Sequence, residues 1–207
     1  KTDAACAASS GKVSTFFGCV AVGGWDLAIQ TNYNNAATHI QSRIRISDTG
    51  AGSPGYITAT DSQVNSTVLR SGDWMHVAMT YSKITGTSKI FLNGISVGSA
   101  QGTAGADITY HVTTPQLFFG ADHGNPSSAE SPFTGNLDEG ALWNKALSAA
   151  EILQIYNNNK PFDLTSNLID YVSSAQLRGY WRMGDPDGAW SYPTITDASD
   201  GTNNGTM

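Results

Sequence analysis

The sequence predicts an all-β protein, folded as a two-sheet antiparallel jelly-roll sandwich with one short helix. Two observations support this class. Short runs in which apolar and polar residues alternate recur along the chain, and turn-forming residues separate them. Helical periodicity is convincing in one short segment, after Ser148. Evenly spaced strands with turns between them are typical of antiparallel sandwiches and jelly rolls.

The first part of the chain contains three alternating runs. Residues 16–29 form two apolar runs that Gly23 and Gly24 separate. Residues 40–47 alternate again, with isoleucines on one face and arginines on the other. A period of two indicates strands that are buried on one face. Residues 49–55, rich in glycine and proline, predict a turn.

The middle of the chain predicts a β-hairpin. Residues 73–81 have a strong strand pattern, and residues 89–92 have the next one. Asn93-Gly94 is the strongest two-residue hairpin signal, and residues 95–99 return as the partner strand. Two further short strands are predicted, at 116–120 and 136–143. Four tryptophans lie in strand patterns and are expected to be buried: Trp25, Trp74, Trp143 and Trp181.

The one predicted helix has a clear start and a clear end. Ser148 is a good N-cap, and Glu151 three residues later completes a capping box. Residues 157–159 are all asparagine and Pro161 follows, which predicts the helix end. The apolar stripe between these signals consists of Ile152, Leu153, Ile155 and Tyr156. This helix is barely three turns long, so it cannot be a principal element of the fold.

Composition excludes several classes of protein. The chain has 207 residues, 11 Lys and Arg against 17 Asp and Glu, and a net charge of −6. This charge argues against nucleic acid or an anionic membrane as a partner, because it repels phosphate. No run approaches the ~20 apolar residues of a membrane-spanning helix, so no membrane insertion is expected. The chain opens on Lys1 without a signal peptide, so we expect a processed protein or part of a longer one.

The two cysteines leave the redox compartment open. Cys6 and Cys19 do not have the spacing of a zinc site or a CxxC redox pair. They predict either one local disulfide or two small thiols in the core or in loops.

Three motifs, in order along the chain, resemble one known family. Segment 72–81 reads GDWMHVAMTY and segment 89–94 reads KIFLNG. Together they resemble the W-x-H-V-A-x-T-Y and Y-V-N-G core of laminin G-like, concanavalin A-like lectin/glucanase jelly rolls. Segment 133–148, FTGNLDEGALWNKALS, looks like a later signature of the same family, which the AEI of 150–152 continues. The resemblance is specific for the fold but not for function, because this fold hosts lectins, adhesion modules and hydrolases.

The C-terminal part resembles the segment that opens such a domain. Residues 179–185 (GYWRMGD) and 196–206 (TDASDGTNNGT) carry this resemblance. Either this segment completes the sheet of its own domain, or it begins a second copy, and we favour the first. We therefore expect a laminin G-like jelly roll over 1–163 and a completing segment over 164–207. Residues 161–164 (PFDL) with 181–185 (WRMGD) resemble, more loosely, the segment that follows this domain in structural proteins of tailed phages, which suggests a virion context.

Catalysis is not expected. The fold includes glycoside hydrolases, whose retaining members hold two carboxyl groups about 5 to 5.5 Å apart. The comparable positions are Asp138 and Glu139, which fall in the predicted strand 136–143. Adjacent strand residues point to opposite faces, so these two cannot form that pair. The histidines are scattered, and His76 is expected to be structural.

Calcium is the candidate metal, because it prefers carboxylate, amide and carbonyl oxygens. The resemblance places Asp138 and Glu139 where related jelly rolls often coordinate calcium. The second candidate group lies in the C-terminal glycine-rich loop and consists of Asp197, Asp200 and Asn203. The alternative for Asp138 is a structural carboxylate that accepts backbone N–H groups.

Glycan binding would need exposed aromatic rings and polar loop side chains. Trp190 and Tyr192 lie in a polar loop that contains proline, and Tyr33 is flanked by asparagines. Asp122 and Asn125 are predicted in a loop before another proline. The alternative is that these rings cover the edge of the core.

The sequence thus predicts a non-catalytic carbohydrate-binding or adhesion module of a larger extracellular or virion-surface protein. Its partners would be surface glycans or neighbouring structural subunits, and a homo-oligomer could form by exchange of the C-terminal strand. The alternative is a structural decoration or spacer protein of a phage capsid, tail or filament that binds no sugar. Large exposed apolar surfaces would favour this alternative.

Overall fold

The computed structural model describes residues 13–19, 24–31, 38–48, 54–60, 72–110, 116–125, 128–130, 133, 135–183, 194–200 and 202–206. The chain divides into two compact units. The first consists of residues 1–92 and 96–136, and the second of residues 93–95 and 137–207. Each unit is described by itself. All strand pairs with a defined register are antiparallel, and α2 is the one α-helix in the described part of the chain, as the sequence predicts.

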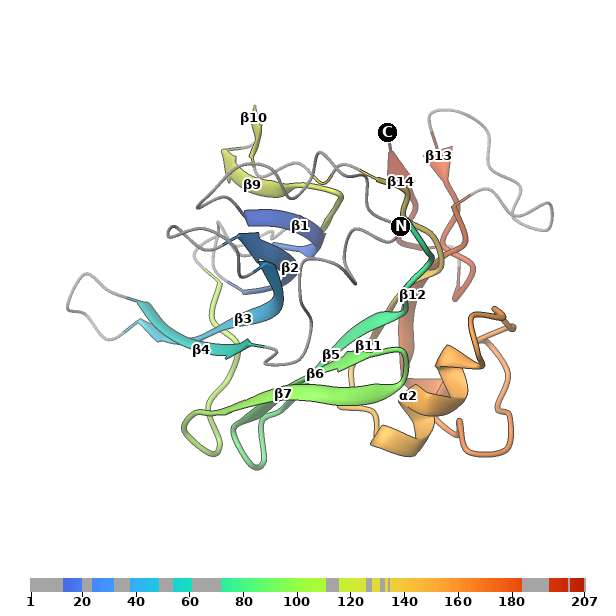
Figure 1. The fold of residues 1–207 in the computed structure, drawn as a ribbon, viewed down its shortest axis with the longest axis horizontal. Coiled ribbons are helices and arrows are strands. Elements are labelled where there is room, and N and C mark those ends of the chain that lie inside the picture. The colour runs from blue at the N-terminus through green and yellow to red at the C-terminus, as the bar shows by residue number, and fades with distance from the viewer. Residues whose placement is uncertain are drawn as a thin grey trace. The chain divides into compact units, whose positions relative to one another are not determined.

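The largest sheet of the first unit has five strands. Its order is β4 (Pro54–Thr60), β3 (Thr38–Asp48), β2 (Trp25–Thr31), β1 (Val13–Gly18) and β8 (Phe118–Phe119). Strands β1 to β4 follow one another in the chain and lie side by side in the sheet (Figure 1). Strands β2 and β3 confirm the alternating runs around residues 25–29 and 40–47. Sequence analysis missed β4, and its predicted turn over 49–55 is too long, because Pro54 and Gly55 pair with β3.

A second sheet contains β5 (Val77–Ser82), β6 (Thr87–Leu92) and β7 (Ile95–Gln101). Asn93 and Gly94 have φ angles of 50° and 79°, as a type I′ hairpin turn requires, which confirms the predicted hairpin. The predicted strand 73–81 was placed too early, because the ladder begins only at Val77. Trp74 therefore lies outside the ladder and is 48% exposed, so the prediction that it is buried is wrong.

The two sheets of the first unit pack face to face as a sandwich. Strand β6 lies against β3 and β4. One face of β3 carries Ile40, Ser42 and Ile44, all completely buried, and Ile90 of β6 is also completely buried. A hydrogen bond of 3.0 Å joins the buried hydroxyls of Ser42 and Ser88 and so links β3 to β6. The isoleucines supply the apolar burial, at about 25 cal/mol per Å², that holds the sheets together.

A short hairpin follows the five-stranded sheet in the chain. Strand β9 (Asp122–Asn125) pairs antiparallel with β10 (Ser128–Glu130). The prediction that Asp122 and Asn125 lie in a loop is therefore wrong, because their backbones pair with β10.

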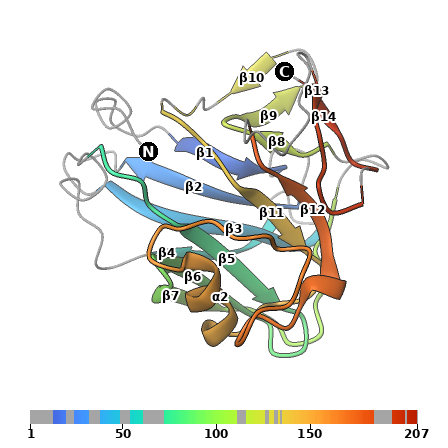
Figure 2. The same cartoon turned by 90° about the vertical axis from the view of Figure 1, so that its right-hand side faces the viewer.

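The second unit is built around a pair of strands. Strand β11 (Gly140–Trp143) pairs antiparallel with β12 (Leu177–Trp181), as Figure 2 shows. A further pair forms from β13 (Thr194–Ile195) and β14 (Gly205–Thr206), and one turn of 3₁₀-helix, η2 (Ser174–Gln176), leads into β12. The apolar core of this unit contains Leu164, Tyr171, Leu177 and Tyr180.

Helix α2 (Ala149–Tyr156) begins and ends as the sequence predicts. The Ser148 hydroxyl accepts the backbone N–H of Glu151, and the Glu151 carboxylate accepts the N–H of Ser148. This reciprocal pair is the predicted capping box. At the other end, Asn157 adopts the left-handed conformation with φ of 41°, and its N–H bonds to the Leu153 carbonyl. Asparagine tolerates that conformation better than most residues, which explains the stop.

The C-terminal segment pairs with the preceding part of its own chain, because Tyr180 of β12 lies opposite Ala141 of β11. The division at residue 163, and completion of one sandwich by residues 164–207, concern both units together and stay predictions. Among the residues that the structure describes, no helix has the length and apolar character that crossing a membrane requires.

Candidate functional site

Asp138 and Glu139 lie just before β11 and not within it. Glu139 has a φ of 53°, and the strand begins at Gly140. The predicted strand 136–143 is therefore too long, since a left-handed residue interrupts extended backbone. The argument that a strand points these two side chains to opposite faces does not apply here. An Asp138 carboxylate oxygen accepts the Glu139 N–H at 2.9 Å, as the structural alternative for Asp138 expected.

Glu139 is the centre of a polar cluster at the surface of the second unit, which we call the Glu139 cluster. One carboxylate oxygen of Glu139 accepts the phenol hydroxyl of Tyr180, and the other lies 3.4 Å from Nε of Arg182. The Arg182 guanidinium carbon lies 5.9 Å from the centre of the Tyr180 ring, within the range of a cation–π contact. Glu139 and Arg182 are partly exposed, and Asp138 beside them is exposed. The cluster thus presents carboxylate acceptors and a guanidinium donor together.

The pKa of the Glu139 carboxyl is raised. Burial raises its pKa above the ordinary value, and the hydrogen bond from Tyr180 and the charge of Arg182 offset this only in part. The pKa of the Tyr180 phenol is also raised, by burial and then by the hydrogen bond to Glu139. Tyr180 therefore remains a hydroxyl donor to Glu139 over the ordinary pH range.

Asp197, from the other predicted metal group, is a buried structural acceptor that is 1% exposed. Its Oδ1 accepts the backbone N–H of Tyr180 at 2.9 Å and both the N–H and the hydroxyl of Ser199. Its Oδ2 accepts the backbone and side-chain N–H groups of Asn203. Burial acts to raise the pKa of Asp197, but the donors from Ser199, Tyr180 and Asn203 outweigh it and lower the pKa.

Asn203 and Asp200 complete the loop around Asp197. Nδ2 of Asn203 also donates to the Arg178 carbonyl at 3.0 Å, and the Asn203 carbonyl accepts the indole N–H of Trp181 at 2.9 Å. Asp200 accepts the N–H and hydroxyl of Thr202, which closes a local turn. Asp197, Asp200 and Asn203 thus lie in one loop, as predicted, and hydrogen bonds from Asp197 and Asn203 hold this loop against β12.

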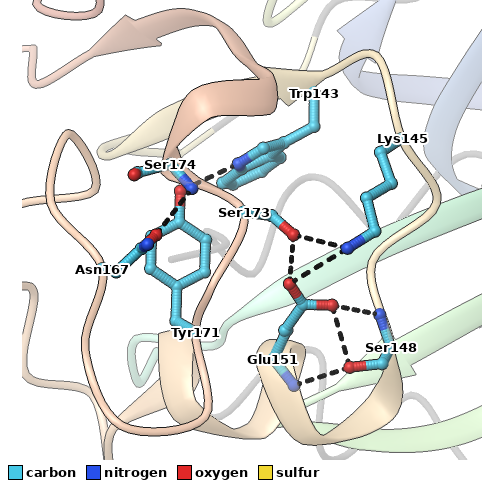
Figure 3. Close-up of polar contacts among 8 residues, drawn as sticks. All are labelled: Trp143, Lys145, Ser148, Glu151, Asn167, Tyr171, Ser173 and Ser174. Atoms are coloured by element: carbon cyan, nitrogen blue, oxygen red, sulfur yellow. Dashed lines mark hydrogen bonds and ion pairs between the residues drawn. The ribbon is translucent and has the colours of Figure 1, made fainter.

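A third carboxylate network lies at the start of α2 (Figure 3). Glu151, 3% exposed, accepts the N–H and hydroxyl of Ser148 at 2.8 and 2.9 Å and the hydroxyl of Ser173. The Lys145 ammonium lies 2.7 Å from the Ser173 hydroxyl and 3.6 Å from Glu151. Burial would raise the pKa of Glu151, but the hydrogen bonds from Ser173 and Ser148 and the charge of Lys145 outweigh it and lower the pKa.

The same network holds the segment that leads into β12. Figure 3 shows the Trp143 indole beside Tyr171, whose hydroxyl accepts the indole N–H at 3.0 Å. The Tyr171 hydroxyl in turn donates to the Leu164 carbonyl at 2.9 Å, and Asn167 accepts the N–H of Ser174. Sequence analysis found the capping box but missed Lys145, Tyr171 and Ser173, because no local pattern brings them to α2.

Calcium coordination is not evident in this arrangement. In the described part of the chain, no three His, Cys, Asp or Glu side chains are grouped so as to hold a metal ion. N–H and O–H donors already surround both oxygens of Asp197, so this carboxylate does not fit a calcium site as it stands. Calcium binding by either predicted group stays a prediction.

The predicted glycan-binding residues are placed only in part. Trp190, Tyr192 and Tyr33 lie outside the described residues. The backbones of Asp122 and Asn125 lie in β9, where Asp122 is opposite Glu130 and Asn125 is opposite Ser128. Their role in binding stays a prediction.

The structure adds an exposed aromatic ring that sequence analysis missed. Trp74 is 48% exposed and follows the exposed Asp73. Gly72, just before them, has a φ of 74°, so the chain turns there instead of extending into β5. Gly72 is the residue of the sequence that indicates this turn. The strong alternation after it predicts a longer strand than the one that forms, which begins at Val77.

Comparison with solved structures supports the fold. The chain is similar to a candidate carbohydrate binding protein from Bacteroides ovatus ATCC 8483, with a TM-score of 0.58 and 24% identity. The match covers 94% of this chain and 47% of the other, so the chain spans about half the length of that protein. At this level of identity, the similarity concerns the fold alone.

A second structure shows a weaker similarity. An S-layer domain-containing protein from Clostridium thermocellum ATCC 27405 has 22% identity and a TM-score of 0.35, over 72% of this chain and 64% of that one. This similarity is too low to support an argument. No curated protein is a significant match to the chain. A family model matches residues 8–153, and the chain therefore belongs to the concanavalin A-like lectin/glucanases superfamily.

Proposed function

We propose that the protein is a non-catalytic carbohydrate-binding module of a larger extracellular or cell-surface protein. Family membership supports the class of ligand, since the superfamily includes lectins. The observation that carries the proposal is the Glu139 cluster, which presents Asp138, Glu139 and Arg182 at the surface of the second unit. Sugar hydroxyls donate to carboxylates and accept from guanidinium groups, so this set of groups matches that ligand.

The side chains of the Glu139 cluster are held in place by one another, so little side-chain entropy would be lost when a sugar binds. Arg182 is held by Glu139 at 3.4 Å and by the face of the Tyr180 ring. Tyr180 is itself fixed, because its backbone N–H bonds to Asp197 at 2.9 Å. A preorganised side chain loses less freedom when a ligand binds.

We propose a binding role rather than hydrolysis. A retaining glycosidase needs a nucleophilic carboxylate and a separate acid at a defined distance. Glu139 has a raised pKa, as a catalytic acid often has, but its two oxygens already bond to Tyr180 and Arg182. The oxygen of Asp138 that accepts the Glu139 N–H serves the local turn. These bonds favour a structural and binding role for the pair.

Trp74 is the aromatic side chain that we propose to stack against a sugar ring. An exposed indole offers an apolar face on which the C–H groups of a sugar ring can stack, and the neighbouring Asp73 offers hydroxyl acceptors. Trp74 belongs to the first unit and the Glu139 cluster to the second, so each is tested separately.

The test is a glycan-array screen of the purified chain, in calcium and again in EDTA. Two variants address the proposed groups: Arg182→Met and Trp74→Ala. Arg178→Met, an exposed arginine on the preceding strand, and Ile84→Ala, an exposed apolar residue, are the matched controls. We expect the array to show binding that Arg182→Met weakens at least tenfold and that both controls retain.

The outcomes separate the proposals. A folded chain that binds no glycan in either buffer contradicts the proposed function. Binding that both Arg182→Met and Trp74→Ala retain leaves the function and removes these residues from it. Loss in EDTA supports the calcium prediction and makes Asp138 and Glu139 the next residues to replace, whereas equal binding in both buffers contradicts a calcium-dependent lectin.

A second candidate function is supported by a different observation. Three apolar side chains near one tight turn of the second unit are exposed, namely Leu168, Ile169 and Val172. Exposed apolar side chains of this kind can contribute to a protein–protein contact. It favours the alternative of a structural protein that binds neighbouring subunits and no sugar, in a virion or another surface assembly. Sedimentation that shows a monomer at all concentrations, together with glycan binding, would rule against it.

A further inference from the structure

One tight turn of the second unit presents an exposed isoleucine in an unfavourable backbone conformation. Leu168 and Tyr171 close this turn by two backbone hydrogen bonds, of 2.8 and 2.6 Å. Ile169, at the first central position, has a φ of 32° and is 83% exposed. Glycine is the residue favoured there, and a β-branched residue with positive φ is a genuine outlier. So exposed a side chain gains little packing within its own chain to offset this cost.

The turn is held firmly below its tip (Figure 3). The Tyr171 side chain is completely buried, and its hydroxyl bonds to the Trp143 indole N–H and to the Leu164 carbonyl. On the other side of the turn, the Asn167 side chain accepts the N–H of Ser174 at 3.1 Å. The tip therefore has a fixed shape and loses little conformational freedom when it meets another surface.

The tip is apolar and carries one negative charge. We define the apolar turn as Leu168, Ile169 and Val172, which are 39%, 83% and 58% exposed. Asp170, next to Ile169, is also exposed, and its side chain has no hydrogen bond or ion pair in the described part of the chain. Exposed apolar side chains that lie close together, with a charge at their border, are suited to contact with another protein.

A second exposed apolar group of the same unit lies where the turn between β6 and β7 meets α2. A Cβ atom at Gly94 would lie 2.7 Å from Cδ1 of Leu153, so this turn packs directly against the helix. Leu153 is 54% exposed, and Ile95, the residue after Gly94, is 65% exposed. We define Ile95 and Leu153 as the helix patch.

A positive charge lies close to the helix patch. The backbone N–H of Asn157 bonds to the Leu153 carbonyl at 3.3 Å, and that of Lys160 bonds to the Asn157 carbonyl at 3.2 Å. These two successive hydrogen bonds keep Lys160 near the end of the helix that carries Leu153. Its side chain is exposed and has no ion-pair partner among the described residues. The apolar turn and the helix patch are thus alike in polarity, and the charges beside them are opposite.

We propose that the apolar turn of one copy of the chain packs on the helix patch of a second copy, with Asp170 paired to Lys160 across the contact. A second copy is the partner that fits, because the chain itself supplies both apolar surfaces and both charges. The contact buries Ile169 and so offsets the cost of its backbone conformation. Two copies related by a two-fold axis make the contact twice, whereas a rotation that does not close gives an open row of copies.

The first test is sedimentation velocity of the purified chain, from about 1 μM to about 1 mM. We expect association that rises with concentration and that Ile169→Asn and Leu153→Gln each weaken about tenfold or more. Ile169→Asn should also melt at the wild-type temperature or higher, because asparagine tolerates positive φ better than isoleucine does. Ile84→Asn, at an exposed isoleucine in a turn of the first unit, is the matched control and should associate as the wild-type chain does. A wild-type chain that stays monomeric over the whole range overturns the proposal.

The second test asks whether these two surfaces meet each other. Asp170→Lys and Lys160→Asp each place like charges together across the contact, and each should weaken association about threefold or more. The double variant Asp170→Lys/Lys160→Asp restores opposite charges in reversed order, and should associate more strongly than either single variant. A double variant as weak as the sum of the two single changes contradicts the proposed pairing.

This contact does not depend on the proposed function, and the two fail in different ways. A monomeric chain that binds array glycans overturns the contact and keeps the proposed function. An associating chain that binds no glycan keeps the contact and overturns the proposed function. Association that survives Ile169→Asn, Leu153→Gln and the charge reversals comes from another surface, such as exchange of the C-terminal strand, and overturns the contact.

Discussion

Tyr180 has a carboxylate at each end, and the two differ in almost every respect. At its backbone N–H lies Asp197, nearly fully buried, which accepts five hydrogen bonds and has a lowered pKa. At its phenol lies Glu139, partly exposed, which has Tyr180 and Arg182 as partners and a raised pKa.

The comparison shows that burial alone does not set the protonation of a carboxylate. Burial acts to raise the pKa in both cases, but the donors around Asp197 outweigh it and the groups around Glu139 offset it only in part. The number of donors decides, because each hydrogen bond stabilises the charged form. Glu151, which accepts from Ser148 and Ser173, behaves like Asp197. Asp197 and Glu151 therefore stabilise the local structure, and Glu139 is the more exposed carboxylate that we propose for ligand binding.

Removing Asp197 is expected to have the largest effect. Asp197→Ala leaves the N–H of Tyr180 and the donors of Ser199 and Asn203 without their acceptor, and the free energy of unfolding should fall by about 3 to 4 kcal/mol. Urea denaturation measures it. Asp200→Ala, in the exposed turn of the same loop, is the control and should cost less than about 1 kcal/mol. Equal losses in both variants would contradict the role given to Asp197.

Lowering the pH is expected to have the next largest effect on stability, and different titratable groups should act over different pH ranges. Burial lowers the pKa of His76 from 6.5 to about 4, so the unfolded chain binds this proton first and stability falls between pH 6.5 and 4, by about 3 kcal/mol. Asp197 and Glu151, with lowered pKa values, stabilise the fold above their unfolded pKa near 4, and this is lost as pH falls further.

Glu139 has the opposite sign in the same experiment. Its raised pKa means that the folded chain binds the proton more tightly, so its own contribution to stability increases as pH falls through that pKa. Glu139→Gln removes this opposing contribution and should make the acid loss of stability steeper. Thermal melts from pH 7 to pH 3 measure both profiles. A shallower profile for Glu139→Gln would show that the sign is wrong.

The capping box offers a smaller, local test of Glu151. Ser148→Ala removes the hydroxyl that accepts the Glu151 N–H, and should lower the free energy of unfolding by about 1 kcal/mol. Ser166→Ala, an exposed serine of the same unit, is the matched control for urea denaturation. A loss of the same size in the control would mean that the box adds nothing.

The smallest change in stability is expected at the phenol of Tyr180. Tyr180→Phe keeps the ring and removes one hydrogen bond to Glu139, for an expected loss of about 1 kcal/mol or less. Glycan affinity should fall more than stability does, because Glu139 loses the hydroxyl that positions it beside Arg182. Isothermal titration with a glycan from the array measures it, and an unchanged affinity would contradict this positioning role.

The sequence by itself determined the class of fold, the hairpin turn and the helix cap. Alternation predicted β2 and β3 of the five-stranded sheet, Asn93-Gly94 predicted the hairpin turn, and Ser148 with Glu151 predicted the start of α2. These features depend on residues close together in the chain, so their physical cause is visible in the sequence. Trp74 shows the limit even here, because the alternation continued past the point where pairing begins, at Val77.

Only the tertiary structure decided which polar residues hold the fold together through hydrogen bonds. Asp197 and Glu139 look alike in sequence, as acidic residues in polar segments, and β12 brings a different number of donors to each. A hydrogen bond depends on distance in space, and Asp197 and Glu139, which lie 17 and 41 positions from Tyr180, acquire that distance only when the chain folds.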